Sequence, residues 1–89
     1  MKEHYVVFGA TEKPDKALIV TKSPETHIRA VTICQLKDGL GKDYGDSVED
    51  GDINGYYTTL MFCKKESLDT FIKSLEVMRE KWDEWNEAL

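Results

Sequence analysis

The chain has 89 residues and a formal net charge of −5, and its 40% hydrophobic and 33% charged content is that of an ordinary folded domain. This composition excludes a disordered tail and a disulfide-stabilised scaffold, and the sequence has no apolar run long enough to cross a bilayer. We therefore expect one domain, residues 1–89. We also expect a cytoplasmic location, because Cys34 and Cys63 are two isolated cysteines and the N-terminus lacks a signal-peptide pattern.

Four segments have the β-branched and aromatic composition of strands. They are residues 4–9, 17–22, 27–37 and 56–63. Short turns with Pro14 and Pro24 separate the first three segments, which favours antiparallel pairing of neighbours. The sequence predicts an α+β fold, in which a four-stranded antiparallel β-sheet (a meander) is followed by one long C-terminal α-helix.

Residues 38–55 form an acidic segment before the last strand, with five glycines and six carboxylates against one lysine. Such a segment is too polar to pack, so we expect a flexible loop. Asp50, Asp52 and Asn54 have the spacing of the first half of an EF-hand calcium loop, but Met61 stands where the motif needs its last carboxylate. Calcium binding is therefore a weak alternative, and we expect no other metal and no cofactor.

Apolar residues near the C-terminus recur every three or four positions. They are Leu68, Phe71, Leu75, Met78, Trp82, Trp85 and Leu89. This spacing is typical of a helix that packs along another helix or a flat surface. A helix over about residues 65–88 would be about 36 Å long, against about 20–27 Å for the strands. The far end needs a partner, and we expect a homodimer with these residues at or beside its interface: Met78, Trp82, Trp85 and Leu89.

The third and fourth predicted strands are apolar on both faces at their centres. One helix covers one face of a sheet, so the second face needs a partner subunit, a ligand or the long loop to cover it. The sequence has no catalytic motif, phosphate-binding loop or metal-ligand spacing. It therefore favours a non-enzymatic interaction or regulatory module that binds a protein partner.

Single-stranded nucleic acid is the alternative ligand, because basic and aromatic residues alternate along the strands, a combination that binds phosphates and stacks bases. The candidate residues are Lys16, Lys22, Arg29, Lys37 and Tyr57. A strand beginning Ile28-Arg29, a later apolar strand, and a helix that opens with Lys65-Glu66-Ser67-Leu68 and continues to Phe71 resemble the PC4-like (YdbC-like) single-stranded-DNA-binding proteins over about residues 16–80. The resemblance implies a dimer formed through the helix and a sheet edge. It also implies a role as a transcriptional or replication accessory protein.

Overall fold

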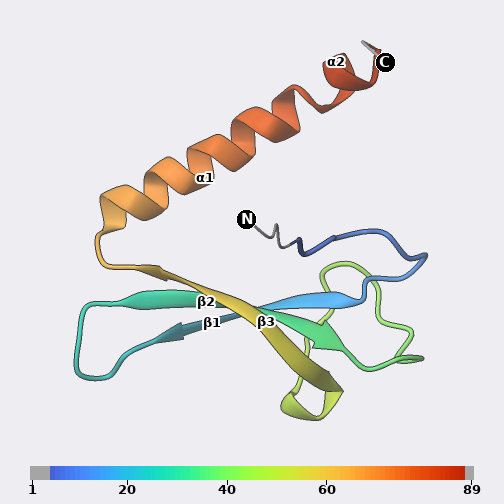
Figure 1. Ribbon diagram of the computed structural model, residues 1–89, viewed down its shortest axis with the longest axis horizontal. Helices are drawn as coiled ribbons and strands as arrows, with labels where there is room; N and C mark the ends of the chain where they lie inside the picture. The colour runs from blue at the N-terminus through green and yellow to red at the C-terminus, as the bar shows by residue number, and fades with distance from the viewer. Residues whose placement is uncertain (1–4, 88–89) are drawn as a thin grey trace.

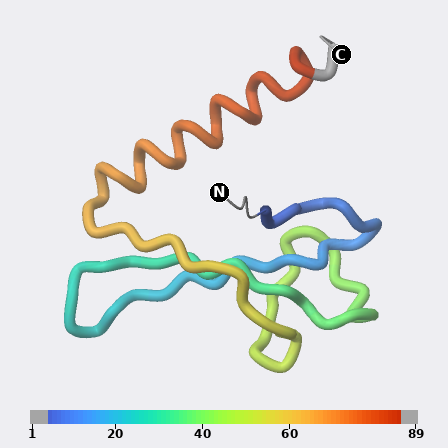
Figure 2. The backbone as a smooth tube through the Cα atoms, in the orientation of Figure 1, coloured from blue at the N-terminus to red at the C-terminus, as the bar shows by residue number. Residues whose placement is uncertain are grey.

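The computed structural model of the chain describes residues 5–87 (Figures 1 and 2). The elements are, in chain order, β1 (Lys16–Lys22), β2 (Arg29–Leu36), the short 3-10 helix η1 (Asp50–Asp52), β3 (Ile53–Phe62), α1 (Lys65–Glu80) and α2 (Trp82–Glu87). The three strands form an antiparallel sheet in the order β1-β2-β3. The predicted α+β class, with an antiparallel sheet followed by C-terminal helix, is confirmed.

The fourth strand, predicted at residues 4–9, is wrong for the part that the structure describes. Residues 5–9 form no strand, and His4 lies outside the described residues. A strand here would have to run straight along the free edge of β1. The chain bends instead at Phe8 and Gly9, where Gly9 takes a φ of 81° in the left-handed region that glycine tolerates. A further bend follows, in which the Thr11 hydroxyl donates to the Lys13 carbonyl oxygen at 2.6 Å.

The pairing register gives the sheet two distinct faces, because paired residues in antiparallel strands share a face. We call one the helix-side face. It is formed by apolar side chains of all three strands: Leu18, Val20, Val31, Ile33, Leu60 and Phe62. The opposite, loop-side face contains Ala17, Cys34 and Leu36, the buried apolar residues of the described chain. The acidic loop covers this end of the loop-side face, and its Val48 lines a cavity together with Ala17 and Leu36.

Strand β3 contains a bulge where it pairs with the end of β2. Ile33 pairs with Thr58 and Cys34 pairs with Tyr56, so Tyr57 is the extra residue between them. The bulge places the Tyr57 hydroxyl where it donates to the Gln35 side-chain oxygen at 2.6 Å. This side-chain hydrogen bond therefore links β2 and β3 at the bulge, where the regular backbone pairing is interrupted.

Helix α1 does not lie flat on the sheet but rises away from it (Figure 1). Its base is held by the rings of Phe62 and Phe71, whose centroids are 5.6 Å apart at an angle of 57°. No residue of α1 is buried. The predicted single helix is also divided, because a turn at Lys81 ends α1 and α2 begins at Trp82.

The molecule is more open than its length requires. Its radius of gyration is 15.4 Å, whereas a compact chain of this length has about 12 Å. Its accessible surface is 7784 Å², whereas a compact monomer of this mass exposes about 5,300 Å². The sheet and α1 each provide an apolar surface, but they meet only around the base of the helix.

Candidate interaction surfaces

One exposed apolar feature is a stripe along the C-terminal helices. It consists of Phe71, Ile72, Leu75, Met78, Trp82 and Trp85, and we call it the helix stripe. Trp82 is 59% exposed and Trp85 is 52% exposed, so the described chain gives neither indole a full set of neighbours. Of the predicted interface residues, Met78, Trp82 and Trp85 are exposed on this stripe, and Leu89 lies outside the described residues.

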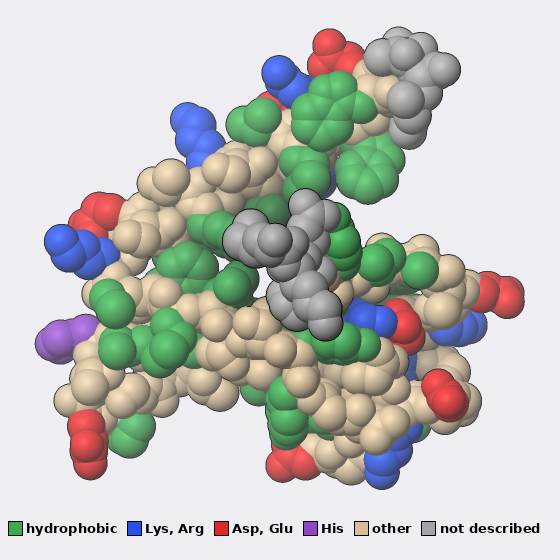
Figure 3. Space-filling view, in the orientation of Figure 1, with side chains coloured by type: hydrophobic (Ala, Val, Ile, Leu, Met, Phe, Trp, Pro, Cys, Tyr) green, Lys and Arg blue, Asp and Glu red, His purple; other side chains and the backbone are tan. Residues whose placement is uncertain are grey.

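The helix-side face of the sheet is a second exposed apolar surface. Val20 is 80% exposed on β1, and its neighbour Leu18 is exposed as well. Val31 and Ile33 on β2 are half-buried. In Figure 3, hydrophobic side chains are visible along the lower side of the helix and on the sheet below it. Among the described residues, Phe62 of the sheet and Phe71 of the helix stripe are in contact.

The predicted nucleic-acid residues do not form one cluster. Lys22 pairs with Arg29 at one end of β1, and Lys16 pairs with Gln35 at the other, six residues or about 20 Å along the strand. Lys37 follows the end of β2, where its backbone N–H donates to the Asp52 carbonyl oxygen at 2.8 Å. The structure therefore separates Lys22 and Arg29 from the other candidates.

Lys16 is half-buried in a side-chain network at the bulged end of the sheet, and its neighbour Tyr57 is 48% exposed. The Lys16 side chain is 10% exposed, and its Nζ donates to Asp15 Oδ2 at 2.7 Å. This hydrogen bond lowers the pKa of Asp15 and raises the pKa of Lys16. The Lys16 ammonium also lies 5.5 Å from the centre of the Tyr57 ring, within range of a cation–π contact. These two side chains stabilise the bulged end of the sheet.

A basic cleft lies at the base of α1. It has a volume of about 270 Å³ and is lined by His27, Arg29, Phe62, Lys64, Lys65 and Leu68. Sequence reasoning identified Arg29 but missed His27, Lys64 and Lys65. The available signal was the Lys64-Lys65 pair at the start of α1, where cations are unfavourable beside the positive end of the helix dipole.

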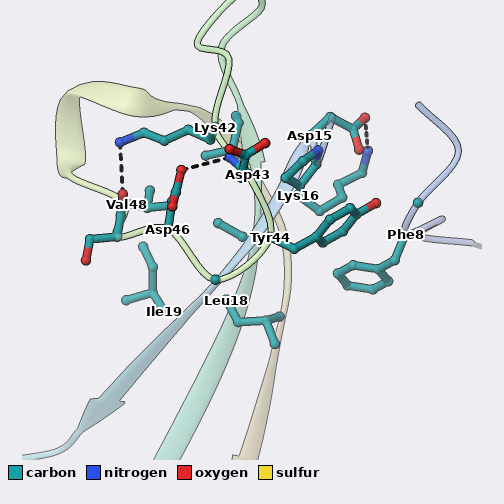
Figure 4. A pocket seen from close by; sticks show the side chains of 16 residues that line it. Phe8, Asp15, Lys16, Leu18, Ile19, Lys42, Asp43, Tyr44, Asp46 and Val48 are labelled. Atoms are coloured by element: carbon teal, nitrogen blue, oxygen red, sulfur yellow. Dashed lines mark hydrogen bonds and ion pairs between the residues drawn. The ribbon is translucent and has the colours of Figure 1, made fainter. Parts of the chain in front are cut away.

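A second, larger cavity of about 590 Å³ lies at the free edge of β1 (Figure 4). Phe8 from the N-terminal segment and Tyr44 from the loop line one side, and Ile19 and Val48 line the other. Asp43 pairs with Lys13 and Asp15 pairs with Lys16, whereas Asp46 accepts the Asp43 backbone N–H and Asp15 Oδ1 is buried without a hydrogen-bond partner. The cavity is therefore mainly an apolar space beneath the loop.

The predicted calcium ligands lie in two consecutive elements. Asp50 and Asp52 lie in η1, and Asn54 lies in the extended backbone of β3. The Asp52 carboxylate accepts the Glu49 backbone N–H at 3.0 Å and lies 3.4 Å from Lys42 Nζ. Across residues 5–87, no three His, Cys, Asp or Glu side chains are grouped as metal ligands.

Of the cysteines, Cys34 is fully buried at 0% exposure, and burial raises the pKa of its thiol. A thiol in this setting is a poor nucleophile. No helix within residues 5–87 is long and apolar enough to span a membrane.

Comparisons with protein-family models, curated proteins and solved structures found no match to this chain. The functional argument therefore depends on the surfaces described above.

Proposed function

We propose that this chain is a non-enzymatic interaction module that acts as a homodimer and binds a protein partner. The observation that carries the proposal is that two apolar surfaces, the helix stripe and the helix-side face, have exposed side chains in the described part of the chain. Exposure of these surfaces to water is unfavourable, because burial of each apolar side chain would lower the free energy. A second copy of the chain carries both surfaces, so each copy can cover the other's.

The excess surface of the chain is large enough for a stable dimer. The chain exposes about 2,500 Å² more than a compact monomer of its mass. A standard protein interface buries about 800 Å² on each partner, and obligate homodimers bury more. Symmetric dimers are also the commonest assemblies of soluble chains. The partner of the dimer as a whole would be basic, because the loop exposes several carboxylates: Asp38, Asp46, Glu49 and Asp50.

Two matched substitutions on opposite faces of the sheet test the dimer. Val20→Glu places a carboxylate on the helix-side face, and Met61→Glu places one at a similarly exposed position, 63%, on the loop-side face. A charge buried in an apolar interface is costly, so Val20→Glu is expected to weaken the dimer at least tenfold, about 1.4 kcal/mol or more. Met61→Glu is expected to leave the dissociation constant unchanged. Equal effects of both substitutions in sedimentation velocity would contradict the proposal.

Binding of single-stranded nucleic acid is a second candidate function, favoured by the basic cleft. Arg29 and its strand neighbour Lys22 join Lys64 and Lys65 near an aromatic ring, Phe62. Cations beside an aromatic ring suit phosphate groups and stacked bases. This candidate also agrees with the sequence resemblance to PC4-like proteins. Both candidates use the helix-side face. They differ in salt dependence, because nucleic-acid affinity falls steeply as salt rises, whereas an apolar dimer interface changes little.

Fluorescence anisotropy with a labelled single-stranded oligonucleotide separates the candidates. Nucleic-acid affinity falls steeply between about 50 and 200 mM salt, because binding releases counterions. Arg29→Glu is expected to abolish such binding, whereas Lys73→Glu on the helix would change it little. Affinity that does not change with salt, or that survives Arg29→Glu, would exclude this mode.

A further inference from the structure

Strand β1 is an edge of the sheet, and one side of its backbone is unpaired within the described chain. Its ladder with β2 includes two hydrogen bonds just beyond the strand, from the Leu36 N–H to the Asp15 carbonyl oxygen at 2.9 Å and from the Ser23 N–H to the Ile28 carbonyl oxygen at 3.1 Å. Because hydrogen-bonded pairs alternate in an antiparallel ladder, the odd-numbered residues of β1 bond to β2 and the even-numbered residues point outward. Within residues 5–87, no backbone group of another segment bonds to this outer side. The outer edge therefore offers N–H and C=O groups to an additional strand.

The sequence of β1 lacks the features that usually keep a sheet edge from pairing with another chain. Between Lys16 and Lys22 it reads ALIVT, without proline, glycine or charge, and its pairing with β2 contains no bulge. The outward-pointing residues Leu18 and Val20 have exposed side chains, at 58% and 80%. A regular apolar edge of this kind suits an extended peptide, which binds through main-chain hydrogen bonds as an added strand.

The charges at the two ends of β1 disfavour a second copy of the same strand as the occupant. In the antiparallel register that pairs all seven residues of two copies, Lys16 of one copy faces Lys22 of the other at both ends. Like charges directly opposite each other destabilise a strand pair. Lys22 also stands opposite Arg29 of β2, and neither side chain has an ion pair within residues 5–87. The Lys22 end of the edge therefore favours a segment that presents a carboxylate.

The large cavity at the same edge has room for one side chain of an added strand. Its volume is about 590 Å³, and Leu18 and Ile19 of β1 line it together with Phe8 and Tyr44 (Figure 4). A strand paired with β1 directs alternate side chains to the helix-side face and the loop-side face. The residue opposite Ile19 points to the loop-side face, where Ile19 and Val48 line the cavity. An apolar or aromatic side chain suits this position.

We propose that β1 binds an extended segment of a protein partner as an added antiparallel strand. This inference rests on the proposed function, because it names what the protein partner presents. From its N-terminal end, the segment carries an acidic residue opposite Lys22 and apolar residues opposite Val20 and Leu18, which extend the helix-side face. Between the two apolar residues, an aromatic residue opposite Ile19 enters the cavity. A basic residue just past Lys16 lies beside the acidic loop, in agreement with a basic partner.

A synthetic peptide of sequence SETVFVTSK is the probe for this edge. Antiparallel pairing sets its Glu opposite Lys22, its Phe opposite Ile19 and its Lys one position past Lys16. Isothermal titration calorimetry measures the dissociation constant and the number of peptides bound per chain. We expect one peptide per chain, bound with a dissociation constant in the micromolar range.

Proline substitutions on the two edges of the sheet form a matched pair. Val20→Pro removes an outward N–H from β1 and leaves the hydrogen bonds to β2. Met61→Pro does the same on the outer edge of β3, because Met61 faces Ala30, which bonds to β1. We expect Val20→Pro to weaken peptide binding at least tenfold and Met61→Pro to leave it within about twofold. Circular dichroism checks that both variants are folded.

Two further comparisons test the geometry without proline in the chain. Lys22→Glu is expected to weaken binding about tenfold, and a peptide with Lys in place of its Glu is expected to restore it. N-methylation of the peptide valine opposite Val20 is expected to block binding, because that N–H points at β1. N-methylation of the peptide phenylalanine, whose N–H points away from β1, is expected to change binding little.

Amide hydrogen exchange measured by NMR distinguishes an added strand from binding of side chains alone. The outward amides of Leu18 and Val20 are expected to exchange rapidly in the free chain and slowly with the peptide bound. The Ile19 amide, which points at β2, is expected to exchange slowly in both states. Leu18 and Val20 amides that are already protected without peptide would show that another segment occupies the edge, and would overturn the inference.

The remaining outcomes separate this inference from the proposed homodimer. A wild-type dimer that does not bind the peptide at concentrations up to about 1 mM overturns strand addition and leaves the homodimer. A monomeric chain that binds the peptide, with the expected losses, contradicts the homodimer and leaves strand addition. Equal losses in folded Val20→Pro and Met61→Pro, or binding that ignores the position of N-methylation, overturn strand addition as well.

Discussion

Asp52 joins the acidic loop to the sheet through several contacts. Its carboxylate accepts the Glu49 N–H and lies near Lys42, and its carbonyl oxygen accepts the Lys37 N–H. The Glu49 hydrogen bond, followed by the charge of Lys42, lowers the pKa of Asp52 below its ordinary value of 3.8. A carboxyl group with a lowered pKa in the folded state stabilises that state when ionised.

Acid unfolding tests this role of Asp52. Its contribution is complete above the unfolded-state pKa of about 3.9, and it is lost as the pH falls through the lower folded-state value. We expect the free energy of unfolding to fall between about pH 4 and pH 2, and to fall less steeply in Asp52→Asn. Urea titrations across this pH range measure the free energy of unfolding. Asp69→Asn on the exposed helix surface is the control. Identical pH profiles for wild type and Asp52→Asn would contradict the assignment.

The two cysteines differ in a way that a chemical probe can detect. Cys34 is buried on the loop-side face with a raised pKa, and Cys63 is exposed at the end of β3. Alkylation by iodoacetamide requires an accessible thiolate. We therefore expect Cys63 to react first in the native protein and Cys34 to react only on unfolding. Mass spectrometry after brief treatment measures the order, and equal labelling of both cysteines would show that the sheet packing is described wrongly.

At the scale of elements, the contact between Phe62 and Phe71 fixes the direction in which α1 leaves the sheet. Phe71 is about as exposed as Val77, but Val77 lies on the side of the helix away from the helix stripe. Phe71→Ala removes a half-exposed ring and its aromatic partner contact, so we expect it to cost about 1–2 kcal/mol of unfolding free energy. Val77→Ala is expected to cost less than about 0.5 kcal/mol. Chemical denaturation of the two variants provides the comparison, and similar costs would argue against the contact.

Substitution of the indoles at the end of the helical segment tests association of two copies rather than the free energy of unfolding. Each Trp buries about 150–250 Å² when it finds a partner. Trp82→Ala/Trp85→Ala is therefore expected to weaken the dimer by at least about tenfold with little effect on the fold. Tyr44→Ala, which removes another exposed aromatic residue in the loop, is the control. Tryptophan emission of wild type is expected to shift to shorter wavelength as concentration rises, and emission that stays constant would weigh against burial of the indoles.

The sequence predicted the elements better than their packing. Residues 17–22, 27–37 and 56–63 correspond to β1, β2 and β3 because β-branched runs and turn residues are local signals. Residues 5–9 have the same composition, but strand formation also needs a neighbour along a straight edge, and the bend at Gly9 prevents it. The break at Lys81 was missed because the apolar spacing continues across it into α2.

The candidate surfaces were also predicted only in part. The sequence predicted that Trp82 and Trp85 lie beyond the sheet, but they are exposed because α1 rises away from the sheet, which leaves Phe71 and Leu75 exposed as well. The basic cleft was not predictable, since it joins His27 and Arg29 to Lys64 and Lys65, which are more than thirty residues apart. The contact between Lys16 and Tyr57 depends on the bulge in β3. No local signal in the sequence indicates a bulge at that position.

At the scale of the whole molecule, the open arrangement of helix and sheet is the dominant feature. The extents of 47 × 36 × 32 Å and the large accessible surface describe a chain whose two apolar surfaces lie apart. A small domain buries a modest fraction of its surface, so leaving these surfaces in water would make it marginally stable. The proposed dimer would remove that cost, and the stability of the chain would then depend on its concentration.

Sedimentation equilibrium of the wild-type chain at about 50 µM is the most direct test of the homodimer. The account predicts a species of twice the chain mass of 10.2 kDa, with a dissociation constant at or below the micromolar range and little dependence on salt. A single species of 10.2 kDa at this concentration would contradict the account, because the helix stripe and the helix-side face would then remain exposed to water.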